Sequence, residues 1–251
     1  MLSVRSDPSP PAVLAAQAVE ELKLLPSVVG LCVLGSVARG DERPDSDVDI
    51  LVATREPLAP RTMLAALPER LRARPLSLVS KTPEGLQRLA EEGSLFLAHA
   101  RTEGRVVYDP ERVLANVFDL STTVPLNTEA EIRRRVSSLK HYRDLARFSD
   151  NFLFALAHLY GIGKGIAIAR SAEAGNTTFV KSDALARLAQ VRPDLRPDVE
   201  AVQRLRPFYD LTRGHQVAEL PFHYVGADEE TRRAVEAVAH LAELDDDSPR
   251  A

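Results

Sequence analysis

The chain has 251 residues, of which 45% are apolar and 27% charged, a balance typical of a soluble globular protein. Its 32 Lys and Arg against 36 Asp and Glu give a formal net charge of −4. A protein that wraps a long nucleic acid needs a basic surface, so this charge argues against extended nucleic acid as a partner.

The first half of the chain alternates predicted helices and strands. After a polar start over residues 1–10, which we expect to fray, apolar residues at helical spacing predict a helix over 11–25. The apolar, β-branched run 28–34 predicts a buried strand. A turn-rich loop follows over 40–46, and residues 47–52 predict a second strand.

Four further elements are expected in this half. An apolar stripe over residues 61–72 predicts a helix, with a kink at Pro68 inside it. In chain order, the other three are a strand at 75–80, a short helix at 84–92 and a last strand at 105–108.

Beyond Pro125 nearly every segment has helical periodicity. Thr128 followed by Glu131 fits a capping box, which predicts a helix that runs to about residue 147. The run Gly161–Gly165 does not match the phosphate-loop pattern, so we expect packing of a helix through small residues, or a break. Further helices are predicted at 151–174, 182–190, 199–212 and 229–244.

These elements predict an α+β chain of two domains, a small mixed-sheet domain over residues 1–122 and a C-terminal helical bundle domain over 123–251. The single cysteine, Cys32, excludes an intramolecular disulfide and is expected in the core. The start of the chain has no signal-peptide pattern, and the apolar stretch 152–169 is interrupted by His158 and Lys164. We therefore expect a cytoplasmic protein with no membrane partner.

Two carboxylates begin the second predicted strand. Side chains at alternate strand positions share a face, so Asp47 and Asp49 project together while Val48 and Ile50 point into the core. Two carboxylates this close repel each other unless a cation lies between them. Hard divalent ions with oxygen ligands suit such a pair, and Mg²⁺ is the expected cofactor.

A phosphate-binding turn is predicted just upstream. Gly35 and Ser36 close the first strand and lead into a short helix, whose first N–H groups attract phosphate. The Ser36 hydroxyl can donate to a phosphate oxygen, and Arg39 can reach the same phosphates or brace an Asp. With Ser46, which precedes Asp47, these residues form the predicted nucleotide-binding set.

The joint pattern over Leu34–Gly40 and Ser46–Val52 resembles the DNA polymerase β-like nucleotidyltransferase superfamily, and is most similar to its minimal and aminoglycoside-type members. The resemblance implies a small mixed-sheet nucleotidyltransferase domain over roughly residues 12–110. It also implies that the Gly35-Ser36 turn holds the triphosphate and that Asp47 and Asp49 bind Mg²⁺ as the catalytic residues.

One departure from the family pattern concerns a third carboxylate, which the family places on the next core strand. The predicted strand Arg74–Ser80 contains no Asp or Glu, and Ser77 occupies the equivalent position. Glu84 lies beyond the strand and is only a remote substitute. Without the third carboxylate, activation of the attacking hydroxyl loses its general base.

Two functions are therefore carried forward. The first is Mg²⁺-dependent transfer of a nucleoside monophosphate from an NTP, with ATP preferred, to a hydroxyl of a small molecule or a protein. The alternative is a catalytically weakened nucleotide-binding module, or an antitoxin-like partner-binding module, that retains the fold. Homodimerisation and pairing with a toxin both stay open.

Overall fold

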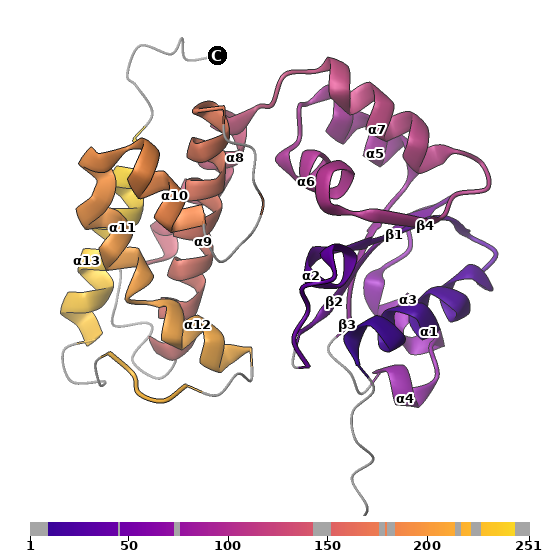
Figure 1. The fold of residues 1–251 in the computed structure, drawn as a ribbon, viewed down its shortest axis with the longest axis horizontal. Helices are drawn as coiled ribbons and strands as arrows, with labels where there is room; N and C mark the ends of the chain where they lie inside the picture. The colour runs from indigo at the N-terminus through magenta and orange to yellow at the C-terminus, as the bar shows by residue number, and fades with distance from the viewer. Residues whose placement is uncertain are drawn as a thin grey trace, which may run out of the picture. The chain divides into compact units, whose positions relative to one another are not determined.

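The computed structural model divides the chain into two compact units, Met1–Leu126 and Asn127–Ala251. A mixed sheet and its helices form the first unit and helices form the second, which confirms the predicted α+β class (Figure 1). The structure describes residues 10–44, 46–72, 76–142, 152–175, 179, 184–213, 217–221 and 227–243.

The sheet of the first unit has four strands in the order β3-β2-β1-β4. β1 is antiparallel to both of its neighbours, whereas β2 and β3 are parallel. The strands are β1 (Val28–Leu34), β2 (Val48–Thr54), β3 (Leu76–Lys81) and β4 (Arg105–Tyr108). All four predicted strands are therefore confirmed, and Pro75, the predicted start of the third, lies outside the described residues.

Every residue of β1 is buried, because helices cover both faces of the sheet. Leu31 and Val33 belong to a core cluster with residues of α1 (Pro11–Lys23), α3 (Pro60–Ala66) and α4 (Glu69–Arg72). Cys32 and Leu34 belong to a second cluster with residues of α5 (Pro83–Glu91), α6 (Leu95–Glu103) and α7 (Val113–Thr123). A strand buried on both faces reads as a continuous apolar run, as this one does.

The helix predicted over 61–72 is two helices. Leu67, between α3 and α4, has an extended backbone with φ −74° and ψ 151°. The ring of Pro68 disfavours helical geometry in the residue before it, so the chain breaks at that point instead of bending.

Two helices of the first unit were not predicted. α6 takes up residues just before the predicted last strand, and α7 runs past residue 122, the predicted end of the domain. The start of α7 is held by the Asp109 carboxylate, which accepts the backbone N–H of Leu114 at 3.1 Å and of Ala115 at 2.9 Å. An N-cap side chain usually accepts the N–H two or three residues later, whereas Asp109 accepts those five and six residues later. The usual capping pattern therefore did not predict this helix start.

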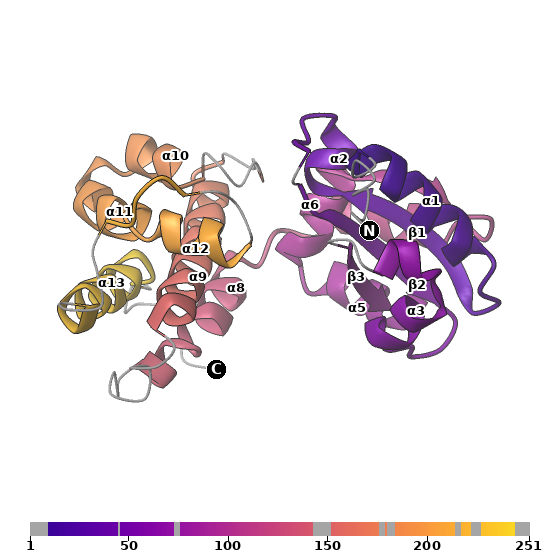
Figure 2. The ribbon, with the colours of Figure 1, turned by 90° about the horizontal axis from the view of Figure 1, so that it is seen from below.

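The second unit is organised around α9 (Phe152–Glu173), which contacts five of the other helices. Figure 2 shows α8, α12 and α13 beside it. The other elements of this unit are α8 (Thr128–Val136), η1 (Leu139–Tyr142), α10 (Ala184–Val191), η3 (Pro193–Leu195), α11 (Arg196–Gln203), α12 (Arg206–Thr212) and α13 (Ala227–Leu241).

Three predictions for this unit were wrong in detail. The helix predicted from Thr128 to about residue 147 ends at Val136, and Leu139–Tyr142 form a separate 3-10 helix. The cap of α8 is Asn127, whose side chain accepts the N–H of Ala130 at 3.0 Å, whereas the Thr128 hydroxyl donates to Glu173. Asparagine is a stronger N-cap residue than threonine, which favours a helix that starts one residue earlier. The helix predicted over 199–212 is also two helices, since Pro207 stands in the first turn of α12.

Among the described helices, α9 is long and apolar enough to cross a membrane, with a mean hydropathy of 1.6. A core helix has the same composition, and 61% of the apolar window of α9 is buried. Within it, the Lys164 ammonium lies 4.3 Å from the ring centroid of Tyr209 and 5.4 Å from that of Tyr160. Aromatic faces stabilise such a desolvated cation by about 2 kcal/mol.

The glycines of α9 let neighbouring helices approach, as expected for a small-residue packing face. A Cβ on Gly163 would lie 2.7 Å from a methyl carbon of Val202 on α11, whereas a Cβ on Gly161 would meet nothing within 4 Å. A methyl group forced into a packed contact costs about 1–3 kcal/mol. A methyl group on an open helical position instead improves helix propensity by about 1 kcal/mol.

We therefore expect Gly163→Ala to lower the free energy of unfolding by about 1–3 kcal/mol, while the matched control Gly161→Ala leaves it unchanged or raises it slightly. Urea unfolding followed by circular dichroism measures both changes. Equal stabilities for the two variants would show that α11 does not pack on Gly163.

Candidate nucleotide and metal site

The predicted site forms where β1 turns into the short helix α2 (Gly35–Arg39) beside the start of β2. Leu34, the last residue of β1, is in register with Asp49 of β2. Gly35 has a φ of +68°, and a Cβ added to it would lie 3.3 Å from Asp49 Oδ2. Any other residue would be strained at this φ and would crowd the carboxylate. The structure thus brings Gly35 and Asp49 together.

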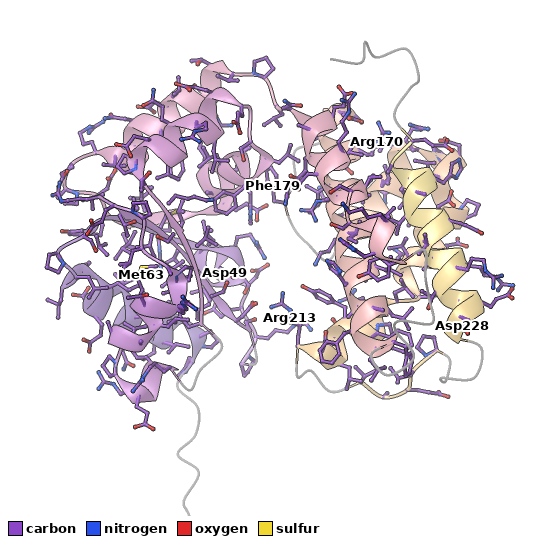
Figure 3. The ribbon with its side chains drawn as sticks, turned by 180° about the vertical axis from the view of Figure 1, so that it is seen from behind. Asp49, Met63, Arg170, Phe179, Arg213 and Asp228 are labelled. Atoms are coloured by element: carbon purple, nitrogen blue, oxygen red, sulfur yellow. The ribbon has the colours of Figure 1, made fainter. Side chains whose placement is uncertain are left out.

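The two predicted metal ligands lie at the start of β2. Val48 and Ile50 are fully buried in the first core cluster, as the alternation predicted, whereas Asp49 is half-buried (Figure 3). Asp47 directly precedes the strand and is also half-buried. Carboxylates at such positions can reach a ligand while the strand behind them stays fixed in the core.

Arg39 lies in the last turn of α2, but its guanidinium is engaged by two carboxylates. Nη1 lies 2.7 Å from Glu103 Oε2, at the end of α6, and Nη2 lies 3.1 Å from Asp41 Oδ1. His99, one turn earlier on α6, places Nε2 3.4 Å from the same Glu103 oxygen. The partners of Arg39 in the structure are Asp41 and Glu103, and its nucleotide-binding role stays a prediction.

The two predicted serines differ in their surroundings. Ser36 is half-buried in the first turn of α2, and its carbonyl accepts the N–H groups of Gly40 at 2.8 Å and Asp41 at 3.1 Å. Ser46 Oγ accepts the N–H of Arg43 at 2.9 Å, which closes the loop before Asp47. Asp45, between them in the motif, lies outside the described residues.

The third carboxylate is absent from its expected place. Ser77 of β3 is in register with Asp49 and is exposed, so it occupies the predicted equivalent position. No group of three His, Cys, Asp or Glu side chains that could hold a metal ion occurs within the described ranges. Glu84 stands in the first turn of α5, beyond the end of β3.

Residues 15–94 match the family described as nucleotidyltransferase domain. This part of the chain is similar to nucleotidyltransferase domains. The match contains Gly35, Ser36, Asp47 and Asp49, the residues that carried the resemblance. No curated protein matches the chain.

Two solved structures are similar to the chain at low identity. Spectinomycin adenyltransferase AAD(9) from Enterococcus faecialis, solved with ATP and spectinomycin, has 15% identity and a TM-score of 0.49, over 90% of this chain and 98% of that one. A nucleotidyltransferase-like protein from Exiguobacterium sibiricum has 16% identity and a TM-score of 0.33, over 92% and 74% respectively.

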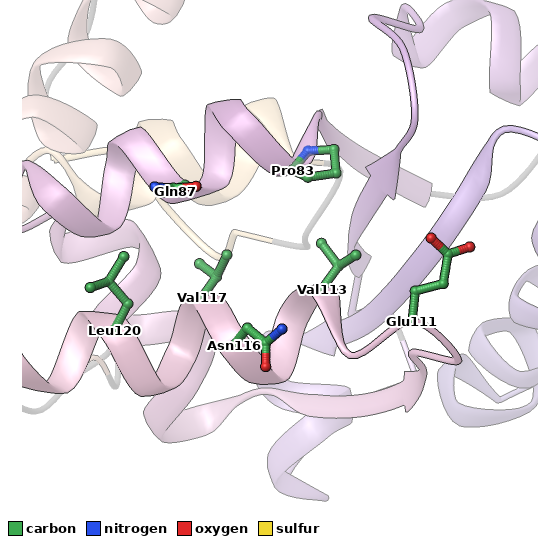
Figure 4. A pocket seen from close by; sticks show the side chains of 7 residues that line it. All are labelled: Pro83, Gln87, Glu111, Val113, Asn116, Val117 and Leu120. Atoms are coloured by element: carbon green, nitrogen blue, oxygen red, sulfur yellow. The ribbon is translucent and has the colours of Figure 1, made fainter.

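Two other features of the first unit are separate from this site. Cys32 is fully buried, and burial raises the pKa of its thiol to about 12, so the core role predicted for it is confirmed. A cavity of about 250 Å³ lies between α5 and α7, and none of the motif residues lines it (Figure 4). Its lining is Pro83, Gln87, Glu111, Val113, Asn116, Val117 and Leu120.

The sequence did not point to Glu103 or His99. Glu103 is 64 residues from Arg39 along the chain, so no local pattern relates them. The sequence does contain one signal, the position of Glu103 in the last turn of a helix. A negative charge there interacts unfavourably with the helix dipole, which a nearby cation offsets. In this unit that cation is Arg39.

Proposed function

We propose that the chain transfers a nucleoside monophosphate from an NTP to a hydroxyl group with release of pyrophosphate, using Mg²⁺ and preferring ATP. The observation that carries this proposal is the approach of the Asp49 carboxylate to the Gly35 turn, with 3.3 Å between Oδ2 and a Cβ at position 35. It places a candidate metal ligand against a candidate phosphate-binding turn, inside a domain of the nucleotidyltransferase family.

The residues at the start of β2 fit a magnesium ion. Mg²⁺ takes oxygen ligands, and proteins hold it through one or two carboxylates together with substrate phosphates. Asp47 and Asp49 would hold it here. When bound, the ion would neutralise charge on the phosphates.

The start of α2 would hold the leaving phosphates. The first N–H groups of a helix have no partner within it and can donate to phosphate oxygens. Gly35 presents its backbone without a side chain, and the Ser36 hydroxyl would add one donor. Ser46 would act indirectly, since its hydroxyl oxygen organises the loop that leads to Asp47.

The acceptor that fits best is a hydroxyl of a small molecule or a protein. A growing nucleic acid would have to replace its counterions with basic side chains, and the net charge of −4 works against that.

A second function is favoured by Ser77, which stands where a third carboxylate would accept the proton of the acceptor hydroxyl. General-base catalysis contributes about 10²–10⁴-fold to a rate. A chain without that group could bind Mg-NTP as a sensor or partner-binding module and turn it over slowly.

Single-turnover assays with α-labelled ATP, GTP, CTP and UTP, each against a panel of hydroxyl-bearing small molecules and against protein acceptors, distinguish the two functions. We expect label to appear on one acceptor class in the presence of Mg²⁺ and to be lost with EDTA. Clear Mg-NTP binding without any transfer would support the non-catalytic module, and absence of binding would refute both.

A further inference from the structure

The ion pair between Arg39 and Glu103 ties the phosphate-binding turn to α6. Its atoms are 2.7 Å apart, and the side chains are only 23% and 10% exposed. The Arg39–Asp41 pair differs, since Asp41 is 55% exposed and only two residues away in the chain. Exposed pairs contribute little to stability, whereas removing one partner of a buried pair leaves an uncompensated charge.

α2 depends on such an anchor because it is short. Five residues form a single turn and a half, and helices of this length are not stable without tertiary contacts. Val37 is buried on one side of α2, and Arg39 extends to Glu103 from its last turn. The Gly35 end of the same helix faces the Asp49 carboxylate.

A histidine of α6 lies beside Glu103. His99 Nε2 lies 3.4 Å from Glu103 Oε2, the oxygen that also pairs with Arg39. The side chains of His99 and Glu103 are 16% and 10% exposed, so the Arg39–Glu103 pair is largely shielded from solvent on the α6 side. Arg39 therefore pairs with one carboxylate on α6, Glu103, and with a second, Asp41, in the loop after α2.

We propose that Glu103 is a positioning residue for nucleotide binding, which acts through Arg39 to hold the Gly35-Ser36 turn against Asp49. This role rests on the proposed function, in which that turn binds the leaving phosphates. In this role Arg39 contacts Glu103 and not the phosphates, and its ion pair holds the C-terminal end of α2.

The test compares Glu103→Gln with Glu111→Gln. The second variant removes the same charge from an ion pair of the same unit, Arg55–Glu111, whose side chains are 59% and 44% exposed. Hydrogen–deuterium exchange over residues 35–41 reports the anchoring of α2 without any ligand. Titration with Mg-ATP, Mg-GTP, Mg-CTP and Mg-UTP reports nucleotide affinity.

We expect Glu103→Gln to speed hydrogen–deuterium exchange in α2. It should also weaken Mg-NTP binding about tenfold, because the loss of one hydrogen bond to a charged group changes an affinity by about that factor. Glu111→Gln should behave as wild type in both measurements. Glu103→Asp should restore part of the affinity, because it keeps the charge.

Tighter binding in Glu103→Gln would overturn the proposal, because it would mean that Glu103 competes with phosphate for Arg39. Unchanged exchange in α2, or equal affinity in all variants, would also overturn it. A wild-type protein that binds no Mg-NTP would instead refute the proposed function, and the exchange data would still decide whether Glu103 anchors α2.

Discussion

Asp49→Asn is expected to weaken Mg-NTP binding by more than about 100-fold, since even groups that only support a metal ligand typically contribute 10–100-fold to metal affinity. The amide keeps the shape of the side chain beside Gly35, so the turn stays intact while the charge that attracts the ion is lost. Asp47→Asn should have the same direction of effect. Isothermal titration with Mg-ATP, with and without EDTA, measures the change.

The matched control is Asp119→Asn, a carboxylate exposed on α7 of the same unit. This variant should bind Mg-ATP as the wild type does and should unfold at the same temperature. If Asp49→Asn also retains wild-type affinity, the ion and the nucleotide bind elsewhere, and the role assigned to the start of β2 is wrong.

Ser77→Asp is expected to raise the rate of transfer by about 100-fold or more, because it supplies the missing general base. Residues in register on neighbouring strands are about 4.8 Å apart and share a face, so the new carboxylate would lie beside Asp49. Ser77 is exposed, and the substitution buries no charge. Single-turnover kinetics with α-labelled ATP and the best acceptor measure the gain.

Ser77→Asn has nearly the same shape without the charge and should show no gain. Repulsion between neighbouring carboxylates makes a second signature specific to the aspartate: its melting temperature should fall without Mg²⁺ and recover when the ion is added. A Ser77→Asp variant as slow as wild type would mean that the lack of a carboxylate on β3 is not what limits turnover.

The parts of the fold that the sequence predicted are those with local causes. β1 is a continuous apolar run and β2 alternates Asp49 with buried neighbours, so their positions follow from side-chain periodicity alone. Ser77 was predicted from the resemblance to occupy the position of the family's third carboxylate, and the structure places it in register with Asp49. The residues of the candidate site lie where β1 ends and β2 begins, so their places in the fold were predictable for that reason.

What the sequence did not predict depends on distant or competing contacts. α7 is capped by Asp109 from outside the usual spacing, and α8 is capped by Asn127 in preference to the hydroxyl of Thr128. The environment of Arg39 depends on Glu103, which only the packing of α6 brings near. Tertiary contacts of this kind do not change the hydrophobic periodicity of the sequence, so the sequence pattern does not predict them.

The strand order β3-β2-β1-β4 determines which part of the sheet unfolds locally first. The two strands that carry Gly35 and Asp49 are the inner pair, and the shortest strand, β4, with four residues, lies at one edge. Local unfolding begins where backbone hydrogen bonds are fewest, so edges open before the centre. Fraying of β4 would therefore leave Leu34 and Asp49 paired, and the proposed nucleotide site should persist when this edge of the sheet opens.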